Sequence, residues 1–515
     1  MVRCSRMCVR VRPLVVAALL LLLTCGGVAR GEDAGRPRPE RHVLGNGVVL
    51  IVQEQRASEV VALQLWMRVG GRDEAPDELG LSHYLEHMLF KGTPTRPPGS
   101  IDRMVESVGG QDNAFTSYDF THFDLLLPAG QAAAGIALLA DIAVNASFDQ
   151  AELDRERLVV LDEMRLTEDD PDRFLARRLS EEAYRPTSYG RPILGTPELI
   201  RALTREQLAR YYHKHYVPRN MSLVVVGAVD PGLIRRAADA AFGRLRGPDS
   251  PRAPMGPPPD LGGRSVDVPR PEKQAYLGLA FRAPAVADPD AAATDLFTYI
   301  LGDSPSSRLN VVVRDRLALV SAVEAGYVTR QAGGLVTVTA RLEPENLDRA
   351  EAAILAEIRR LQQDGVGEAE RQRAIITAEA NYAFDIETAE GLARDYGEAE
   401  TNWTLAEELG YLTRLRQTTA APRGCASCPR RAPGEAAPPG PAGGARAGGA
   451  RRPRRAAGGP GAARQRRHAA RTREPGGAGG GGLAAGSDGH ALGDRGRRRP
   501  LQLRPGRDGD RDRQA

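Results

Sequence analysis

Residues 80–92 read Gly-Leu-Ser-His-Tyr-Leu-Glu-His-Met-Leu-Phe-Lys-Gly, and the rest of the chain is organised around this stretch. It sets His83, Glu86 and His87 in the spacing His-x-x-Glu-His. On an α-helix these positions share one side, so both imidazoles and the carboxylate can face one ion. Two neutral imidazoles beside a carboxylate are the ligands and the base that a zinc hydrolase needs. The pattern is short, and ordinary core or surface histidines on a helix would also produce it.

The N-terminal segment, residues 1–31, has the features of a signal peptide. Four arginines precede an apolar run at residues 14–23, and small residues follow it. The run is too short to span a bilayer comfortably. We therefore expect export to the periplasm or the extracellular space. The alternative is an uncleaved signal that keeps the protein associated with a membrane.

Composition restricts the chemistry of the mature chain. All 5 cysteines lie at or before residue 25 or at or after residue 425, so no thiolate between them can serve as nucleophile or zinc ligand. A metal ion in that region must be held by histidine and carboxylate. The formal net charge of +4 over 515 residues is too small to indicate a nucleic-acid partner.

The pattern of apolar runs and turns predicts an α+β protein with two homologous domains, each a mostly antiparallel sheet flanked by helices. The first domain is expected at residues 41–246 and the second at 264–421, joined by a proline-rich linker at 247–263. In the first domain, the predicted elements are a hairpin turning at Asn46-Gly47, strands at 60–69 and 221–227, one or two strands at 113–127, and helices at 80–92, 101–108 and across 131–216.

The second domain repeats the order of elements without repeating the histidines. We predict strands at 275–281, 321–328 and 335–342, and helices at 290–301 and 347–363. This order indicates a degenerate internal duplication and a non-catalytic second domain. Residues 415–421 resemble the start of a further helix, so we expect the domain to be truncated at its end.

The C-terminal tail, residues 422–515, differs from the rest of the chain. It contains no Val, Ile, Phe, Met, Tyr or Trp and is dominated by Arg, Gly, Ala and Pro. Such a segment cannot bury enough apolar surface to offset its chain entropy, which predicts disorder. Our hypothesis is that a frameshift in a GC-rich gene produced it, and an intact frame in independent isolates would contradict this. The alternative is a basic segment that binds RNA.

A catalytic zinc ion normally takes three protein ligands, and the motif helix supplies two. A long helix that begins near Asp149 offers the next candidates, Glu156, Asp162 and Glu163. Glu156 and Glu163 are two helical turns apart and share a face. Solvated charged faces produce the same pattern. Spacing alone does not decide which of the three carboxylates is the third ligand.

The inverted motif, followed by the sequence from Glu156 to Glu163, resembles the pitrilysin/insulinase family of zinc metallopeptidases, the inverzincins. The closest likeness is to the two-domain branch that includes the mitochondrial processing peptidase and bacterial relatives. The resemblance implies one Zn²⁺ per catalytic domain, held by His83, His87 and Glu163. It also implies that Glu86 is the general base and that Glu156 supports the site.

Further segments strengthen this resemblance, which covers roughly residues 41–421. Residues 189–195, 216–220 and 302–309 are similar to signatures of the family's two domains. The strand containing Asn113, Ala114, Phe115 and Thr116 resembles the one on which relatives bind substrate backbone as an added strand.

The resemblance implies a zinc-dependent endopeptidase acting on extended peptides or unfolded polypeptide segments. It also implies a second two-domain subunit, making a homodimer or a heterodimer with an inactive paralogue, and no nucleic acid. The alternative is a non-catalytic structural or partner subunit of a peptidase-like complex. Relatives of that kind typically lose motif residues, and all of them are present here. A third hypothesis is that truncation of the second domain prevents folding and activity.

Overall fold

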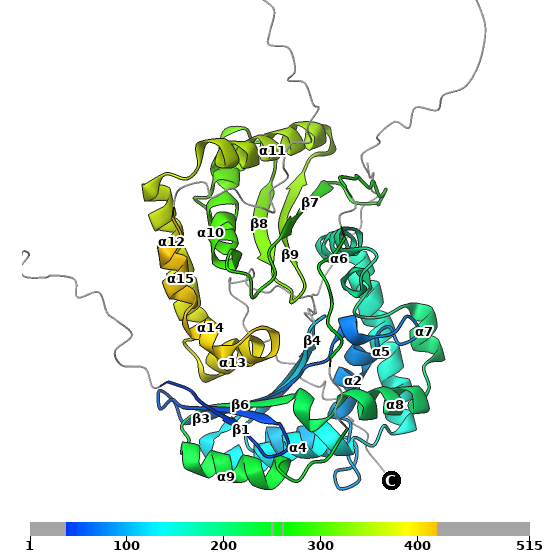
Figure 1. Cartoon of the computed structure of the whole chain (residues 1–515). Coiled ribbons are helices and arrows are strands. Elements are labelled where there is room, and N and C mark those ends of the chain that lie inside the picture. The colour runs from blue at the N-terminus through cyan, green and yellow to red at the C-terminus, as the bar shows by residue number, and fades with distance from the viewer. Residues whose placement is uncertain (1–37, 249–251, 260–261, 420–515) are drawn as a thin grey trace, which may run out of the picture. The chain divides into compact units, whose positions relative to one another are not determined.

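The computed structural model describes residues 38–248, 252–259 and 262–419 (Figure 1). The predicted signal peptide at 1–31 and the tail at 422–515 lie outside the described residues. The described residues from Glu40 onward belong to one compact unit. Within it, the structure consists of a six-stranded and a three-stranded sheet with helices packed against both.

The six-stranded sheet has the order β1-β2-β6-β3-β5-β4. Its strands are β1 (Glu40–Val43), β2 (Val49–Glu54), β3 (Val60–Met67), β4 (Gln111–Thr116), β5 (Thr121–Pro128) and β6 (Met221–Gly227). Only the pair β2 and β6 is parallel. The predicted fold class, α+β with mostly antiparallel sheets flanked by helices, is confirmed. The β1–β2 hairpin turns through Asn46-Gly47, where Gly47 takes a φ of 93°.

Helices pack on one face of this sheet and enclose the main core. They are α2 (Leu81–Leu89), α3 (Ser100–Ser107), α4 (Ala132–Asn145), α5 (Gln150–Asp169), α7 (Pro197–Ala202), α8 (Arg205–His215) and α9 (Pro231–Phe242). Helix α6 (Pro171–Tyr184) follows α5 but packs on strand β7 of the second sheet. The sequence analysis did not identify α9. Its start signal was present, because Asp230 caps the helix through the Leu233 amide and Pro231 occupies the first turn.

The three-stranded sheet has the order β7-β9-β8, and both of its pairs are antiparallel. Its strands are β7 (Ala275–Ala283), β8 (Ala322–Val328) and β9 (Gly334–Leu342). The accompanying helices are α10 (Ala291–Leu301), the short π-helix η5 (Asn310–Arg316), α11 (Leu347–Asp364), α12 (Glu368–Asp385), α13 (Ala389–Asn402), α14 (Leu405–Leu409) and α15 (Tyr411–Gln417).

The second sheet repeats half of the first. The order β7-β9-β8 matches β3-β5-β4, α10 follows β7 as α2 follows β3, and α11 follows β9 as α4 follows β5. Within the described residues, the second sheet has no counterpart of β1, β2 or β6. The prediction that residues 415–421 begin a helix was wrong, because α15 ends at Gln417.

Helix α13 from the second half covers the face of the first sheet opposite α4, packing on β3 and β6. Gly397 lies directly against the indole of Trp66, and a Cβ at residue 397 would fall 1.9 Å from the indole nitrogen. Glu400 on the same helix accepts two 2.8 Å hydrogen bonds from Arg41 and one of 3.1 Å from Arg68. The first sheet therefore depends on the second half for one of its two layers.

Among the described residues, no single helix is long and apolar enough to cross a membrane. Residues 129–145 and helix α5 together are long and apolar enough for a membrane span, but the two segments are bent by 93° relative to each other. In α4, the residues on the sheet side belong to the main core.

Replacing Gly397 with alanine should loosen the contact between α13 and the first sheet. A methyl group cannot fit beside Trp66, and overpacking of this kind costs about 1–3 kcal/mol of unfolding free energy. Urea denaturation of the full chain, followed by circular dichroism, should show a lower midpoint. Gly367→Ala is the control, since its φ is −67° and no atom lies within 4 Å of the added Cβ. Equal midpoints for both variants would contradict the packing described here.

Candidate metal centre

Helix α2 begins in a tightly built turn. Gly80 takes a φ of 92°, and a Cβ there would fall 2.7 Å from the Leu194 carbonyl oxygen, so a larger residue would strain the start of the helix. The buried Glu74 carboxylate accepts hydrogen bonds from the backbone amides of Gly80, at 2.9 Å, and Ser82, at 2.7 Å. Burial raises the pKa of Glu74 to about 8, and the two amide bonds offset this only in part. Glu74 thus satisfies amides at the start of α2 that would otherwise lack a partner.

The turn that carries Glu74 is held by residues distant in the sequence. Arg252, in the linker, makes a bidentate pair with Asp73 at 2.9 and 2.6 Å. Arg72 donates to Asp119 at 3.0 Å and to Gln331 of the second half at 2.9 Å. The linker and the second half therefore help to fix the position of α2.

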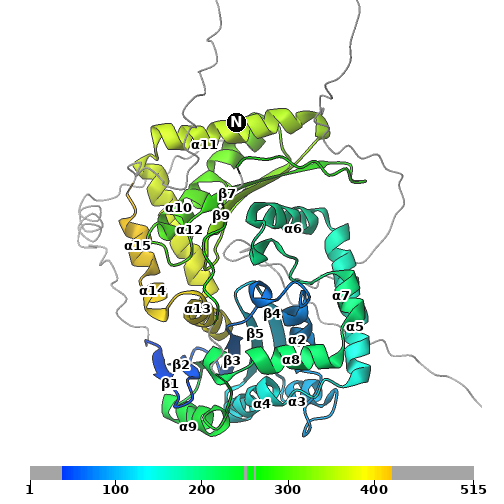
Figure 2. The same ribbon diagram turned by 45° about the vertical axis from the view of Figure 1, so that its right-hand side comes forward.

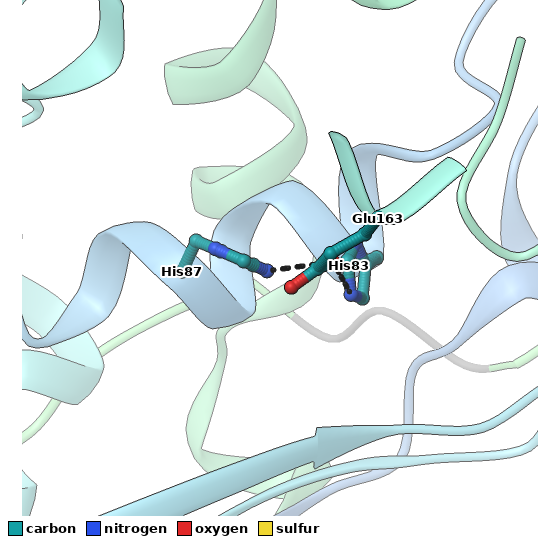
Figure 3. Close-up of side chains that lie close together, drawn as sticks. All are labelled: His83, His87 and Glu163. Atoms are coloured by element: carbon teal, nitrogen blue, oxygen red, sulfur yellow. Dashed lines mark ion pairs between the residues drawn. The ribbon is translucent and has the colours of Figure 1, made fainter. Parts of the chain in front are cut away.

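His83 and His87 lie on the face of α2 that meets α5. Both α5 and α8 pack against α2 (Figure 2). Glu163 on α5 points between the two rings (Figure 3). Its Oε2 is 3.4 Å from His83 Nε2 and 3.5 Å from His87 Nε2. Within the described part of the chain, these residues form the one cluster of three His, Cys, Asp or Glu donors spaced for a metal ion.

The spacing fits a tetrahedral zinc ion. Zinc bonds of about 2.0–2.1 Å at tetrahedral angles separate neighbouring ligand atoms by about 3.3–3.4 Å. The Oε2 atom of Glu163 is buried and has no hydrogen-bond partner among the described residues. Leaving a buried carboxylate oxygen unpaired is costly, so the geometry suits an ion between the three groups.

Glu156 orients the second histidine. Its Oε2 accepts from His87 Nδ1 at 2.9 Å, which leaves Nε2 facing Glu163, and its Oε1 pairs with Lys91 at 2.9 Å. Burial alone would raise the pKa of Glu156, but these two partners lower it below the ordinary value. Sequence reasoning did not single out Lys91. Its position four residues after His87, just beyond the end of α2, was the available signal.

The site holds an excess of negative charge when no metal is considered. Burial opposes a charge on His87, but its hydrogen bond to Glu156 and the nearby carboxylates of Glu163 and Glu86 raise the pKa of His87 to about 10. Burial lowers the pKa of His83. The pKa of Glu163 is also lowered, since the two histidines outweigh its burial. The carboxylates thus favour a cation at this point, a proton on His87 or a metal ion.

The structure separates the carboxylates that the sequence left open. Glu156 and Glu163 face α2, whereas Asp162 points to solvent and pairs with Arg165 on its own helix. Glu86 lies on α2 beside the histidines. Its Oε2 is buried without a hydrogen-bond partner in the described residues.

The strand proposed to bind substrate lies at the edge of the first sheet. β4 packs beside α2, and β5 is its one hydrogen-bonded neighbour among the described strands. Ala114 packs against the main core, and Thr116 is buried. Asn113 and Phe115 project to the other face and line a cavity there. The outer edge of β4 is therefore free to accept a further strand.

Two family models match the chain. Residues 49–197 match the model described as Insulinase (Peptidase family M16), and residues 202–377 match the model described as Peptidase M16 inactive domain. The first match contains both histidines, Glu86 and Glu163. The second agrees with the absence of the motif from the second half.

Relatives and solved structures point the same way. An uncharacterized zinc protease of Rickettsia bellii is 30% identical over 342 residues, covering 66% of this chain and 82% of the relative. One of Bacillus subtilis is 29% identical over 332 residues, covering 64% and 79%. A protease from Helicobacter pylori has a similar fold, with a TM-score of 0.71, 24% identity and coverage of 75% of this chain and 94% of that one. With its matched domains and its inverted motif, the chain belongs to peptidase family M16, the insulinase or pitrilysin family.

Proposed function

We propose that the protein is a zinc-dependent endopeptidase that hydrolyses extended peptides or unfolded polypeptide segments. The observation that carries the proposal is the convergence of His83, His87 and Glu163 at zinc-ligand spacing, with Glu86 beside them. We propose one zinc ion per chain, held by these three residues. The relatives named zinc proteases support the proposal.

A zinc ion supplies Lewis-acid chemistry, which polarises the peptide carbonyl and acidifies water. Glu86 is the general base in the proposed reaction. Its unpartnered carboxylate oxygen takes the proton from the attacking water and delivers it to the nitrogen of the leaving amine. Glu156 keeps His87 in the tautomer that presents Nε2.

The free edge of β4 is the proposed binding surface for substrate backbone. An extended peptide can hydrogen-bond along this edge as an additional strand, which recognises main chain rather than a particular sequence. Asn113, Ala114, Phe115 and Thr116 form the edge. Because β4 packs beside α2, a peptide added there passes close to the three ligands.

We further propose that a second two-domain subunit, identical or paralogous, completes the substrate chamber of an exported enzyme. His87 and Glu163 retain 13% and 20% side-chain exposure, so the ligand cluster opens to solvent rather than being closed by this chain. The alternative role, a non-catalytic subunit, requires neither the ligand spacing nor a free base at Glu86.

Replacing Glu86 with glutamine should leave zinc content unchanged and abolish turnover. The amide cannot accept the proton, and a positioned general base contributes about 10²–10⁴-fold to such reactions. Zinc analysis and cleavage of an unfolded protein substrate check both parts, with Glu106→Gln on α3 as a control. Wild-type activity in a zinc-loaded Glu86→Gln protein would show that another group is the base.

The carboxylates on α5 should differ in their effect on zinc affinity. Glu156→Gln removes only the hydrogen-bond partner of His87, which should weaken zinc affinity by about 10–100-fold. Glu163→Gln removes a ligand and should weaken binding more. Asp162→Asn, at an exposed position between them, should have no effect. Competition with a fluorescent chelator measures the three values, and equal effects of Asp162→Asn and Glu163→Gln would refute the ligand assignment.

Zinc affinity should rise with pH. The raised pKa of His87, about 10, means that the metal-free protein holds a proton there, and zinc must displace it. Between about pH 7 and pH 9, affinity should therefore increase about tenfold per pH unit. The same proton stabilises the metal-free fold below pH 6.5, and this contribution disappears as pH rises through about 10. Calorimetry should detect about one proton released per zinc at pH 8, and an affinity independent of pH would contradict this.

A further inference from the structure

A cavity of about 660 Å³ lies on the face of the first sheet opposite α2. Its walls come from β4 and β5 on one side and from helices and loops of the second half on the other. This volume is typical of sites for small ligands. Aromatic rings form much of the wall, among them Trp66, Phe115, Tyr327 and Tyr382.

The charges of the cavity are strongly unequal. Nine carboxyl side chains line it against three arginines and one histidine. Burial, followed by the neighbouring Glu398, raises the pKa of Asp395 to about 7. Burial also raises the pKa of Glu398. Acidic side chains thus outnumber basic ones in the wall, and burial favours the protonated forms of Asp395 and Glu398 over the charged ones.

Several polar atoms in the wall have no partner among the described residues. They are His122 Nδ1, Asp124 Oδ1, Arg330 Nε and Asn402 Oδ1. His122 and Arg330 are only 6% and 8% exposed. His122 is held rigidly, since its Nε2 is 3.1 Å from Asp124 Oδ2 and its ring lies 4.3 Å from that of Trp66. Buried polar atoms of this kind normally have partners, which points to a ligand rich in hydrogen-bond donors.

We propose that this cavity is a binding site for an organic cation, an ammonium or guanidinium group. Asp124 and Asn402 offer acceptors, the exposed carboxylate of Asp288 supplies attraction, and the aromatic faces stabilise a desolvated cation. The Nε donor of Arg330 accommodates an oxygen of an amide or hydroxyl group attached to the same ligand, and His122 Nδ1 can accept a hydrogen bond from it, since Nε2 of that ring donates to Asp124. The site is distinct from the metal centre, which lies on the α2 side of the sheet.

The cation has two possible sources. One is a free polyamine. The other is a lysine or arginine side chain of a polypeptide bound along β4, and this source rests on the proposed function. Side chains of a strand alternate between faces. Asn113 and Phe115 already point into the cavity, so every second side chain of an added strand would point there too.

Calorimetry on the full-length Glu86→Gln protein, loaded with zinc, can separate the sources, because this variant is expected not to consume peptide. The probes are spermidine, a lysine-containing decapeptide and its norleucine analogue. We expect binding of spermidine, of the lysine peptide in preference to its analogue, or of both. Spermidine binding alone identifies a free cation, and lysine-dependent peptide binding alone identifies a substrate side chain.

Variants on both walls locate the site. Asp124→Asn and Asp288→Asn should each weaken binding by about fivefold, the upper range for one ion pair near a surface. Asp239→Asn, exposed on α9, is the matched control. Asp288 is itself exposed, so its replacement tests the proposal even if Asp124→Asn disturbs folding. Absence of binding by both cations, or binding unaffected by both cavity variants, would overturn the proposal. Failure of peptidase activity alone would leave the spermidine result valid.

Discussion

The contact between α2 and α5 places the Glu163 carboxylate between a buried and a half-buried imidazole, and the rest of the structure serves to hold that contact. Glu163 reaches both histidines at distances too long for good hydrogen bonds and suited to a shared ion. Glu156 and Lys91 fix one ring, and Glu74 fixes the start of the helix. These contacts to neighbouring groups hold the ligand side chains in position.

The sequence predicted the parts of this site that depend on residues close together in the chain, and missed those that depend on distant segments. His83, Glu86 and His87 could be recognised because helical periodicity is local. The choice among Glu156, Asp162 and Glu163 needed family resemblance, since spacing places two of them on one face. Glu74, Arg252 and Gln331 were missed because their roles arise only when segments far apart in the chain come together. The cavity between the halves was unpredictable for the same reason.

The same distinction applies to the fold. Strands and most helices followed from apolar alternation and turn residues, and the mostly antiparallel arrangement agrees with the prediction. The sequence did not predict that α13 covers the first sheet, because nothing local marks Gly397 as the partner of Trp66. The second half, although it lacks the motif, thus contributes a layer to the sheet that carries the edge proposed to bind substrate.

The parallel pairing of β2 with β6 affects how the scaffold can assemble. β2 has β1 and β6 as its partners, so the N-terminal hairpin joins the rest of the sheet through a strand that ends at residue 227. During synthesis, β2 can pair with β1 at once but finds its second neighbour only after β6 has been made. Pairings separated so widely in sequence form slowly. The sheet beneath the candidate metal centre is therefore expected to be completed late.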